Sequence, residues 1–245
     1  MLSLRKVCLH YARGERHVVR VLEGVSLDVG AGEVVCVWGQ RGQGKTTLLK
    51  VAAGLVRPAG GEVLFGGDDV WELPEERRAG LLGDAIGWVE LAAPEAVDEP
   101  VLDVVAMPVL RAGGRDEALA LARRALDVAG ASGCAGEVWG SLDEEERARV
   151  ALARGVVCEP RLLLVDDLTA RLGERAGNEV GGLLAGWARE HGVGVLASVS
   201  SLSEATWSDR VATLYGGELL AAPRVPSGEG GEVVQLRGRP PSAAG

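Results

Sequence analysis

Lysine is scarce in this chain of 245 residues and occurs only at positions 6, 45 and 50. Arginine therefore carries nearly all of the positive charge, and acidic residues outnumber basic ones to leave a formal net charge of −9. Because the arginines are scattered through a net acidic chain, the composition argues against a nucleic-acid-binding surface. We expect no nucleic acid among the partners of this protein.

Cysteine and histidine are also few. The chain has four cysteines and three histidines, which are Cys8, Cys36, Cys134, Cys158, His10, His17 and His191. They show no Cys-x-x-Cys or Cys/His ligand spacing. This pattern predicts free thiols in a reducing cytosol and argues against a histidine metal site.

Long hydrophobic runs are missing as well. No apolar stretch approaches the roughly 20 residues that a membrane-spanning helix needs, and the N-terminus has no apolar signal segment. We therefore expect a cytoplasmic protein with a well-buried core, in which any membrane role comes through a partner.

The most informative feature that is present lies at residues 34–47, which read VVCVWGQRGQGKTT. An apolar run, a glycine-rich loop and Lys-Thr-Thr predict a buried strand, a phosphate-binding loop and the first turn of a helix. The loop matches G-x-x-x-x-G-K-[ST] at each fixed position, and glycines allow backbone N–H groups to surround phosphates without a Cβ in the way. The residues expected to bind the nucleotide are Gly39, Gln40, Arg41, Gly42, Gln43, Gly44, Lys45, Thr46 and Thr47.

Two side chains of this loop have predicted roles. Lys45 is expected to reach the β- and γ-phosphates, and the hydroxyl of Thr46 is expected to ligate Mg²⁺. ATP and Mg²⁺ are therefore the expected cofactors. A glycine turn beside a chance lysine is the alternative, and it leaves the preceding strand and the following apolar helix unexplained.

The rest of the pattern predicts an α/β chain with a helical insert. Residues 2–30 alternate as antiparallel strands do, and the segment from about 95 to 155 is helical in pattern. Further strands are expected at 33–38, 86–89, 162–167, 192–199 and 208–219. From about residue 223 the chain is rich in glycine, proline and serine, and we expect residues 223–245 to be disordered.

The order of these segments resembles an ABC-transporter ATP-binding subunit over roughly residues 2–220. The resemblance rests mainly on the phosphate loop, RARVALAR at 147–154, LLLVDD at 162–167 and SDRVATLYGGEL at 208–219. VLDVVAMPVL at 101–110 is similar to the lipoprotein-release and macrolide-export branch of that family.

The resemblance implies a P-loop NTPase fold of the ABC ATPase type. It implies a central, mostly parallel sheet, an N-terminal antiparallel β region and an inserted helical subdomain. The ATP-binding domain is then expected to span residues 1–222, with the helical subdomain at about 92–157.

The resemblance also implies roles for three residues outside the loop. Asp166 would hold the Mg²⁺ shell together with Thr46, and Asp167 stands where the family has the glutamate that polarises the attacking water. Tyr11 stands where the family stacks an aromatic ring on adenine. An ordinary tyrosine at a strand edge fits the sequence equally well.

Several positions depart from the family pattern. The family's Q-loop glutamine falls on Leu91, or on Glu90 if the alignment slips by one residue. Its switch histidine falls on Ser200, and its D-loop aspartate falls on Gly173. Aspartate at 167 also withdraws the carboxylate by about 1.5 Å relative to glutamate, and such a displacement can cost about 10²-fold in rate. The departures predict weak or slow hydrolysis.

The signature motif LSGGQ of the family becomes LDEEE at residues 142–146. Asp143 and Glu146 have the spacing of a capping box, which suits a helix that begins in solvent. In the family this helix faces the γ-phosphate of a second subunit. Two unit charges about 5 Å apart cost about 3 kcal/mol at an effective dielectric constant near 20. We therefore expect a dimer with another ATPase subunit, as a heterodimer rather than a homodimer.

The leading interpretation is an ATP-binding subunit of an ABC transporter. It would dock on a membrane permease subunit at the cytoplasmic face and couple ATP binding, with weak or slow hydrolysis, to transport. The sequence leaves open a catalytically degenerate nucleotide-binding regulatory or scaffold protein that is not engaged in transport. A P-loop kinase acting on a small molecule fits the order of the motifs less well.

Overall fold

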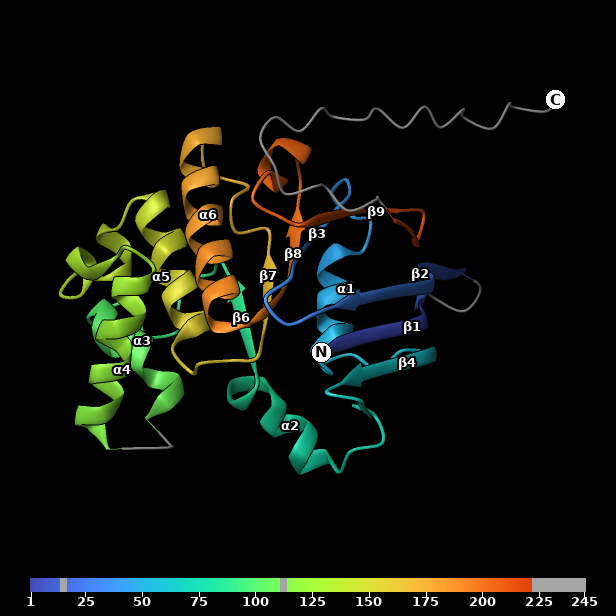
Figure 1. Cartoon of the computed structure of the whole chain (residues 1–245), viewed down its shortest axis with the longest axis horizontal. Coiled ribbons are helices and arrows are strands. Elements are labelled where there is room, and N and C mark those ends of the chain that lie inside the picture. The colour runs from blue at the N-terminus through green and yellow to red at the C-terminus, as the bar shows by residue number, and fades with distance from the viewer. Residues whose placement is uncertain (14–16, 111–113, 222–245) are drawn as a thin grey trace.

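Two β-sheets and a group of helices make up the fold of the computed structural model (Figure 1). The structure describes residues 1–13, 17–110 and 114–221. The segment 223–245, for which we predict disorder, lies outside the described residues. Within these ranges no helix is both long enough and apolar enough to cross a lipid bilayer.

The larger sheet has six strands in the order β10-β9-β3-β8-β7-β6. Their bounds are β3 (Val34–Trp38), β6 (Ile86–Glu90), β7 (Leu162–Asp166), β8 (Gly194–Val199), β9 (Arg210–Tyr215) and β10 (Glu218–Ala221). All neighbouring pairs from β9 to β6 are parallel, and only β10 runs antiparallel to its neighbour. The predicted central, mostly parallel sheet is confirmed.

The central strands are apolar along almost their whole length because helices or the second sheet cover both of their faces. Every residue of β8 is buried, and in β7 only Asp166, the last residue, is partly exposed. Parallel strands end at the same edge of a sheet, so the residues that follow β3, β7 and β8 are brought together there.

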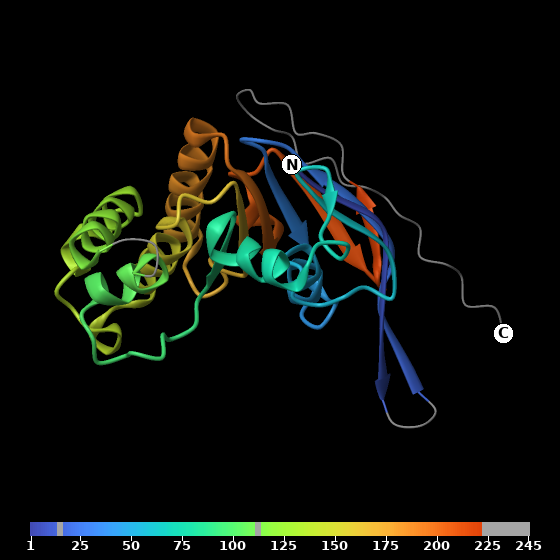
Figure 2. The same cartoon turned by 90° about the horizontal axis from the view of Figure 1, so that it is seen from below.

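The smaller sheet is antiparallel and has the order β2-β1-β4-β5. Its strands are β1 (Leu2–Arg13), β2 (His17–Val29), β4 (Gly60–Phe65) and β5 (Asp68–Asp69). Helix α1 (Lys45–Ala52) packs between the two sheets, since its buried leucines share one hydrophobic cluster with both of them. In Figure 2 the β1–β2 pair extends well beyond the rest of the domain.

The remaining helices lie on the other side of the large sheet or beside it (Figure 1). The α-helices are α2 (Glu75–Asp84), α3 (Val101–Ala106), α4 (Arg115–Val128), α5 (Glu144–Val156) and α6 (Glu174–His191). Short 3₁₀ helices are η1 (Met107–Val109), η2 (Ser132–Cys134), η3 (Trp139–Ser141) and η4 (Leu202–Ala205). Helices α3 to α6 share a second hydrophobic cluster with the sheet.

Helix α2 was not predicted from the sequence. Its segment, EERRAGLLGD, contains two glycines that weaken the helical pattern. Pro74 directly before the helix and the acidic pair Glu75 and Glu76 in its first turn are nevertheless typical of a helix start.

All four cysteines are free, as predicted. Cys36 lies in β3, where burial raises the pKa of its thiol to about 12. Such a thiol stays protonated and unreactive at neutral pH.

Close packing of helices on the sheet requires glycine at several positions. A Cβ on Gly155 of α5 would overlap Val89 of β6. On α6, a Cβ on Gly181 would overlap the indole ring of Trp207. The next residue, Gly182, is exposed and has no neighbouring atom within 4 Å of where its Cβ would lie.

We expect Gly181→Ala to lower the free energy of unfolding by about 1–3 kcal/mol, because it overpacks the Trp207 contact. The neighbouring Gly182→Ala is the control and should raise that free energy by up to about 1 kcal/mol, because alanine has the higher helix propensity. Urea denaturation of the two variants measures the difference. Equal effects of the two substitutions would contradict the proposed packing.

Candidate nucleotide-binding site

The loop between β3 and α1 is shaped for backbone approach to a ligand. Gly42 and Gly44 have φ angles of 85° and 98°, a region that side chains rarely adopt. A Cβ on Gly39 would lie 2.7 Å from the carbonyl oxygen of Leu214, and one on Gly44 would lie 2.8 Å from Val21 Cγ1. Glycine is therefore needed at these positions, and the loop has the form that a phosphate cradle requires.

Lys45, the first residue of α1, folds back over this loop. Its side chain is buried, with 8% relative exposure. The ammonium donates hydrogen bonds to the carbonyl oxygen of Gly39 at 2.6 Å and to Ser200 Oγ at 3.3 Å. A cation is thus held inside the loop by polar atoms, in a position suited to a phosphate group.

Thr46 and Asp166 meet at the edge of the sheet. Thr46 Oγ1 lies 2.8 Å from Asp166 Oδ2 and 3.1 Å from Oδ1. A hydroxyl and a carboxylate are hard oxygen ligands, which Mg²⁺ prefers, and Mg²⁺ sites in nucleotide-binding proteins commonly use one or two protein carboxylates plus phosphate oxygens. The predicted pair therefore fits a Mg²⁺ ion.

Asp167 and Ser200 are also in contact. Ser200 Oγ lies 2.9 Å from each carboxylate oxygen of Asp167, to which it can donate one hydrogen bond. Since the same hydroxyl accepts from Lys45, a polar chain runs from the ammonium to the Asp167 carboxylate. The structure thus brings together both residues for which the family resemblance implies a catalytic role.

Ser198 is a site residue that sequence reasoning missed. Its hydroxyl donates to Asp166 Oδ1 at 2.8 Å and accepts from the backbone N–H of Asp167 at 2.9 Å. The side chain is 1% exposed. A polar residue inside the apolar run VLASV was the available signal, but its partners become known only when β7 and β8 pair.

The other predicted loop residues take different positions. Gln43 Oε1 accepts a hydrogen bond of 2.9 Å from the N–H of Gly216, which ties the loop to the β9–β10 turn. Gln40 and Arg41 are exposed, whereas Thr47 is half-buried.

Tyr11 lies on the β1–β2 pair with 46% exposure. It follows the buried Leu9 by two residues and so shares its face of β1. The neighbouring strand β2 contacts the phosphate loop, since Val21 packs against Gly44. This placement fits the predicted adenine contact, and it equally fits an ordinary strand-edge tyrosine.

By the resemblance, the glutamine of the family falls on Leu91, or on Glu90 if the alignment slips by one residue. Glu90 ends β6, is exposed and pairs in register with Asp166 of β7. Leu91 is partly buried against the helical hydrophobic cluster. A hydrocarbon side chain in that position cannot hydrogen-bond a metal-bound water.

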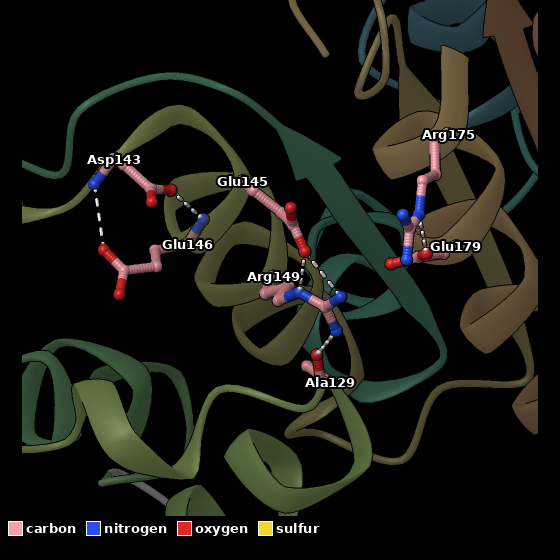
Figure 3. Close-up of polar contacts among 7 residues, drawn as sticks. All are labelled: Ala129, Asp143, Glu145, Glu146, Arg149, Arg175 and Glu179. Atoms are coloured by element: carbon pink, nitrogen blue, oxygen red, sulfur yellow. Dashed lines mark hydrogen bonds and ion pairs between the residues drawn. The ribbon is translucent and has the colours of Figure 1, made fainter. Parts of the chain in front are cut away.

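Helix α5 begins with a capping box, as predicted. The N–H of Glu146 donates to Asp143 Oδ1 at 2.8 Å, and the N–H of Asp143 donates to Glu146 Oε2 at 2.9 Å (Figure 3). Glu145 forms an ion pair of 2.7 Å with Arg149. The carboxylates of Asp143, Glu145 and Glu146 therefore all have partners within the same chain.

Topology places this helix start on the same edge of the sheet as the phosphate loop. Helix α5 packs against β6, and residues 157–161 connect it to β7. Since β7 begins at the opposite edge, α5 runs against the strand direction and starts at the edge where Asp166 lies. The Cys134 thiol lies near this helix start. Burial raises the pKa of the thiol most, and the negative charges of Glu146 and Asp143 raise it further.

Comparison with known families gives one match to a family model. The model described as ABC transporter matches residues 22–170. Two similar relatives are named lipoprotein-releasing system ATP-binding protein LolD. The one from Oleidesulfovibrio alaskensis is 34% identical, covering 89% of this chain and 95% of the relative. The one from Geobacter metallireducens is 34% identical, covering 90% and 98%.

Solved structures with the same fold include two of the ATP-binding cassette MJ0796. The dimeric cassette superposes with a TM-score of 0.81 at 26% identity, covering 89% of this chain and 96% of that one. A post-hydrolysis state bound to ADP and Pi gives a TM-score of 0.83 at 25% identity, covering 91% and 98%.

Proposed function

This chain belongs to the ABC transporter family as an ATP-binding subunit, and from that premise we propose how it works. It binds MgATP at residues 39–47 with Thr46 and Asp166 at the metal, docks on a membrane permease at the cytoplasmic face, and couples nucleotide binding to transport. The ATP-binding domain spans residues 1–222, with α3 to α5 in a helical subdomain at about 92–157.

The observation that carries this proposal is the joint placement of Lys45, Thr46 and Asp166. The ammonium lies inside the glycine loop, and the hydroxyl is in contact with the carboxylate at the end of β7. Bound Mg²⁺ would supply charge neutralisation for the phosphates. The residues of this chain hold the phosphates, orient the metal-binding carboxylate and keep the lysine charge out of bulk water.

We expect Lys45→Ala to weaken MgATP binding by at least about 10-fold, because it removes a charge-assisted contact to the phosphates. Lys50→Ala is the matched control, since Lys50 lies on the same helix and is exposed. Isothermal titration calorimetry of MgATP into the three proteins measures the effect. Absence of binding by the folded parent chain would contradict the proposal.

Hydrolysis is proposed to be slow because the groups that act on the attacking water are altered. Asp167 is one methylene shorter than glutamate, and both of its oxygens lie within hydrogen-bonding distance of Ser200. Serine cannot place an imidazole at a γ-phosphate, and Leu91 has no polar atom. Electrostatic stabilisation by Lys45 and the metal remains, so a low rate is retained.

We expect phosphate release by the isolated chain to lie far below ordinary enzyme turnover, which is about 1 s⁻¹ or higher. Because little catalysis is left to lose, Asp167→Asn should change that rate by less than about 10-fold. A phosphate-release assay at saturating MgATP compares the two proteins. Turnover above about 1 s⁻¹ that Asp167→Asn abolishes would disprove the proposal.

A dimer with a different ATPase subunit is favoured over a homodimer. The solved relative MJ0796 forms a dimer, and the acidic start of α5 lies on the edge of the sheet that carries the phosphate loop. An approach of this helix start to a phosphate would meet Glu144, which is exposed. Each charge pair of this kind opposes closure by about 3 kcal/mol at 5 Å.

We expect the pure chain to keep the same mass in light scattering with and without MgATP. Glu144→Gln removes one charge while the Asp143–Glu146 capping box and the Glu145–Arg149 pair stay intact. If charge is the obstacle, this variant should self-associate more strongly with MgATP than the parent does. An ATP-dependent dimer of the parent chain would contradict the preference for a heterodimer.

Binding to a membrane permease would distinguish a transport subunit from a purely regulatory or scaffold protein. The relatives named lipoprotein-releasing system ATP-binding protein support a partner of that transport type. Co-purification of this chain with a polytopic membrane protein is the expected result, and a chain that repeatedly purifies without one would favour the scaffold alternative.

A further inference from the structure

Ser198 connects the two acidic residues of the nucleotide site, although it lies on a different strand. It is the penultimate residue of β8 and pairs in register with Asp166 on β7. The hydroxyl donates to Asp166 Oδ1 at 2.8 Å and accepts from the N–H of Asp167 at 2.9 Å. With 1% exposure, it makes these bonds away from competing water.

The hydrogen bond to the N–H of Asp167 supports an unusual backbone conformation. Asp167 has a φ angle of 51°, in the left-handed region. A residue other than glycine there costs about 1–2 kcal/mol, and the chain must compensate for it. The Ser198 hydroxyl gives the N–H of this residue a partner and so helps to hold the turn that directs Asp167 toward Ser200.

The hydrogen bond to Asp166 acts on the metal-binding carboxylate itself. Two donors from different elements hold this group: Thr46 from α1 and Ser198 from β8. Thr46 is itself an expected metal ligand, so its contact with Asp166 belongs to the proposed metal site. Ser198 is buried behind the carboxylate and can keep its hydrogen bond with or without the metal.

We propose that Ser198 is a positioning residue for Mg²⁺, which acts through Asp166 and touches neither the metal nor the nucleotide. This inference rests on the proposed MgATP binding and deepens it. Groups that orient a metal ligand typically change metal affinity by about 10–100-fold when they are removed. The hydroxyl at position 198 should therefore set the Mg²⁺ concentration at which ATP affinity reaches its full value.

The surroundings of Ser198 allow a matched pair of variants. The residue borders a small cavity of about 10 Å³, which Thr169, Leu184 and Trp207 also line. Ser198→Thr and Ser198→Val differ from each other only by the hydroxyl, because threonine and valine have nearly the same shape.

The test is calorimetric ATP binding over a series of free Mg²⁺ concentrations and in EDTA. We expect Ser198→Val to raise the Mg²⁺ midpoint by about 10-fold or more, while Ser198→Thr stays much closer to the parent chain. ATP affinity in EDTA should be alike in all three proteins, because the phosphate loop is unchanged. A general loss of structure would instead weaken binding in EDTA as well.

Ser198→Ala adds no volume and is measured beside the other two, in case the larger side chains prevent folding. It should share the raised midpoint of the valine variant. Equal midpoints for threonine and valine, or a parent-like midpoint for alanine, would overturn the role of Ser198 while leaving MgATP binding intact. A parent chain whose ATP affinity does not depend on Mg²⁺ would overturn both this inference and the proposed metal site.

Discussion

Parallel pairing of β3, β8 and β7 is the constraint on which the nucleotide site depends. Their backbone hydrogen bonds align the ends of the three strands at one edge of the sheet. Helix α1 follows β3 after the phosphate loop and places Lys45 and Thr46 over that edge, where Thr46 meets Asp166 from 120 residues away in the sequence. Because the strands are buried on both faces, the edge is the place where their polar ends can gather.

The proposed site separates the residues that would bind a nucleotide from the residues that would act on water. The binding parts come from one continuous segment, residues 39–47, together with Asp166. The residues to which the resemblance assigns a role at the attacking water follow β6, β7 and β8: Leu91 is packed into an apolar cluster, while Asp167 and Ser200 engage each other. A chain can therefore keep nucleotide affinity while it loses rate, since the two sets of groups lie on different segments.

The acidic start of α5 illustrates how local stability and assembly can oppose each other. Carboxylates at a helix N-terminus are favourable in water, and the capping box satisfies two backbone N–H groups that would otherwise lack partners. The same charges repel a phosphate brought against them. What stabilises this helix in the single subunit thus opposes any assembly that brings it against a phosphate, and the proposed heterodimer rests on this argument.

Features that a few neighbouring residues encode were predictable. The phosphate loop and the capping box of Asp143 and Glu146 depend on spacings of three to five residues, and the mostly parallel sheet was expected from the resemblance to the ABC transporter family. Helix α2 escaped prediction because its glycines interrupt the periodic pattern. The contacts of Ser198 with Asp166 and of Ser200 with Lys45 join segments 32 and 155 residues apart. They depend on the register between strands, and a shift of one residue would turn each side chain to the opposite face.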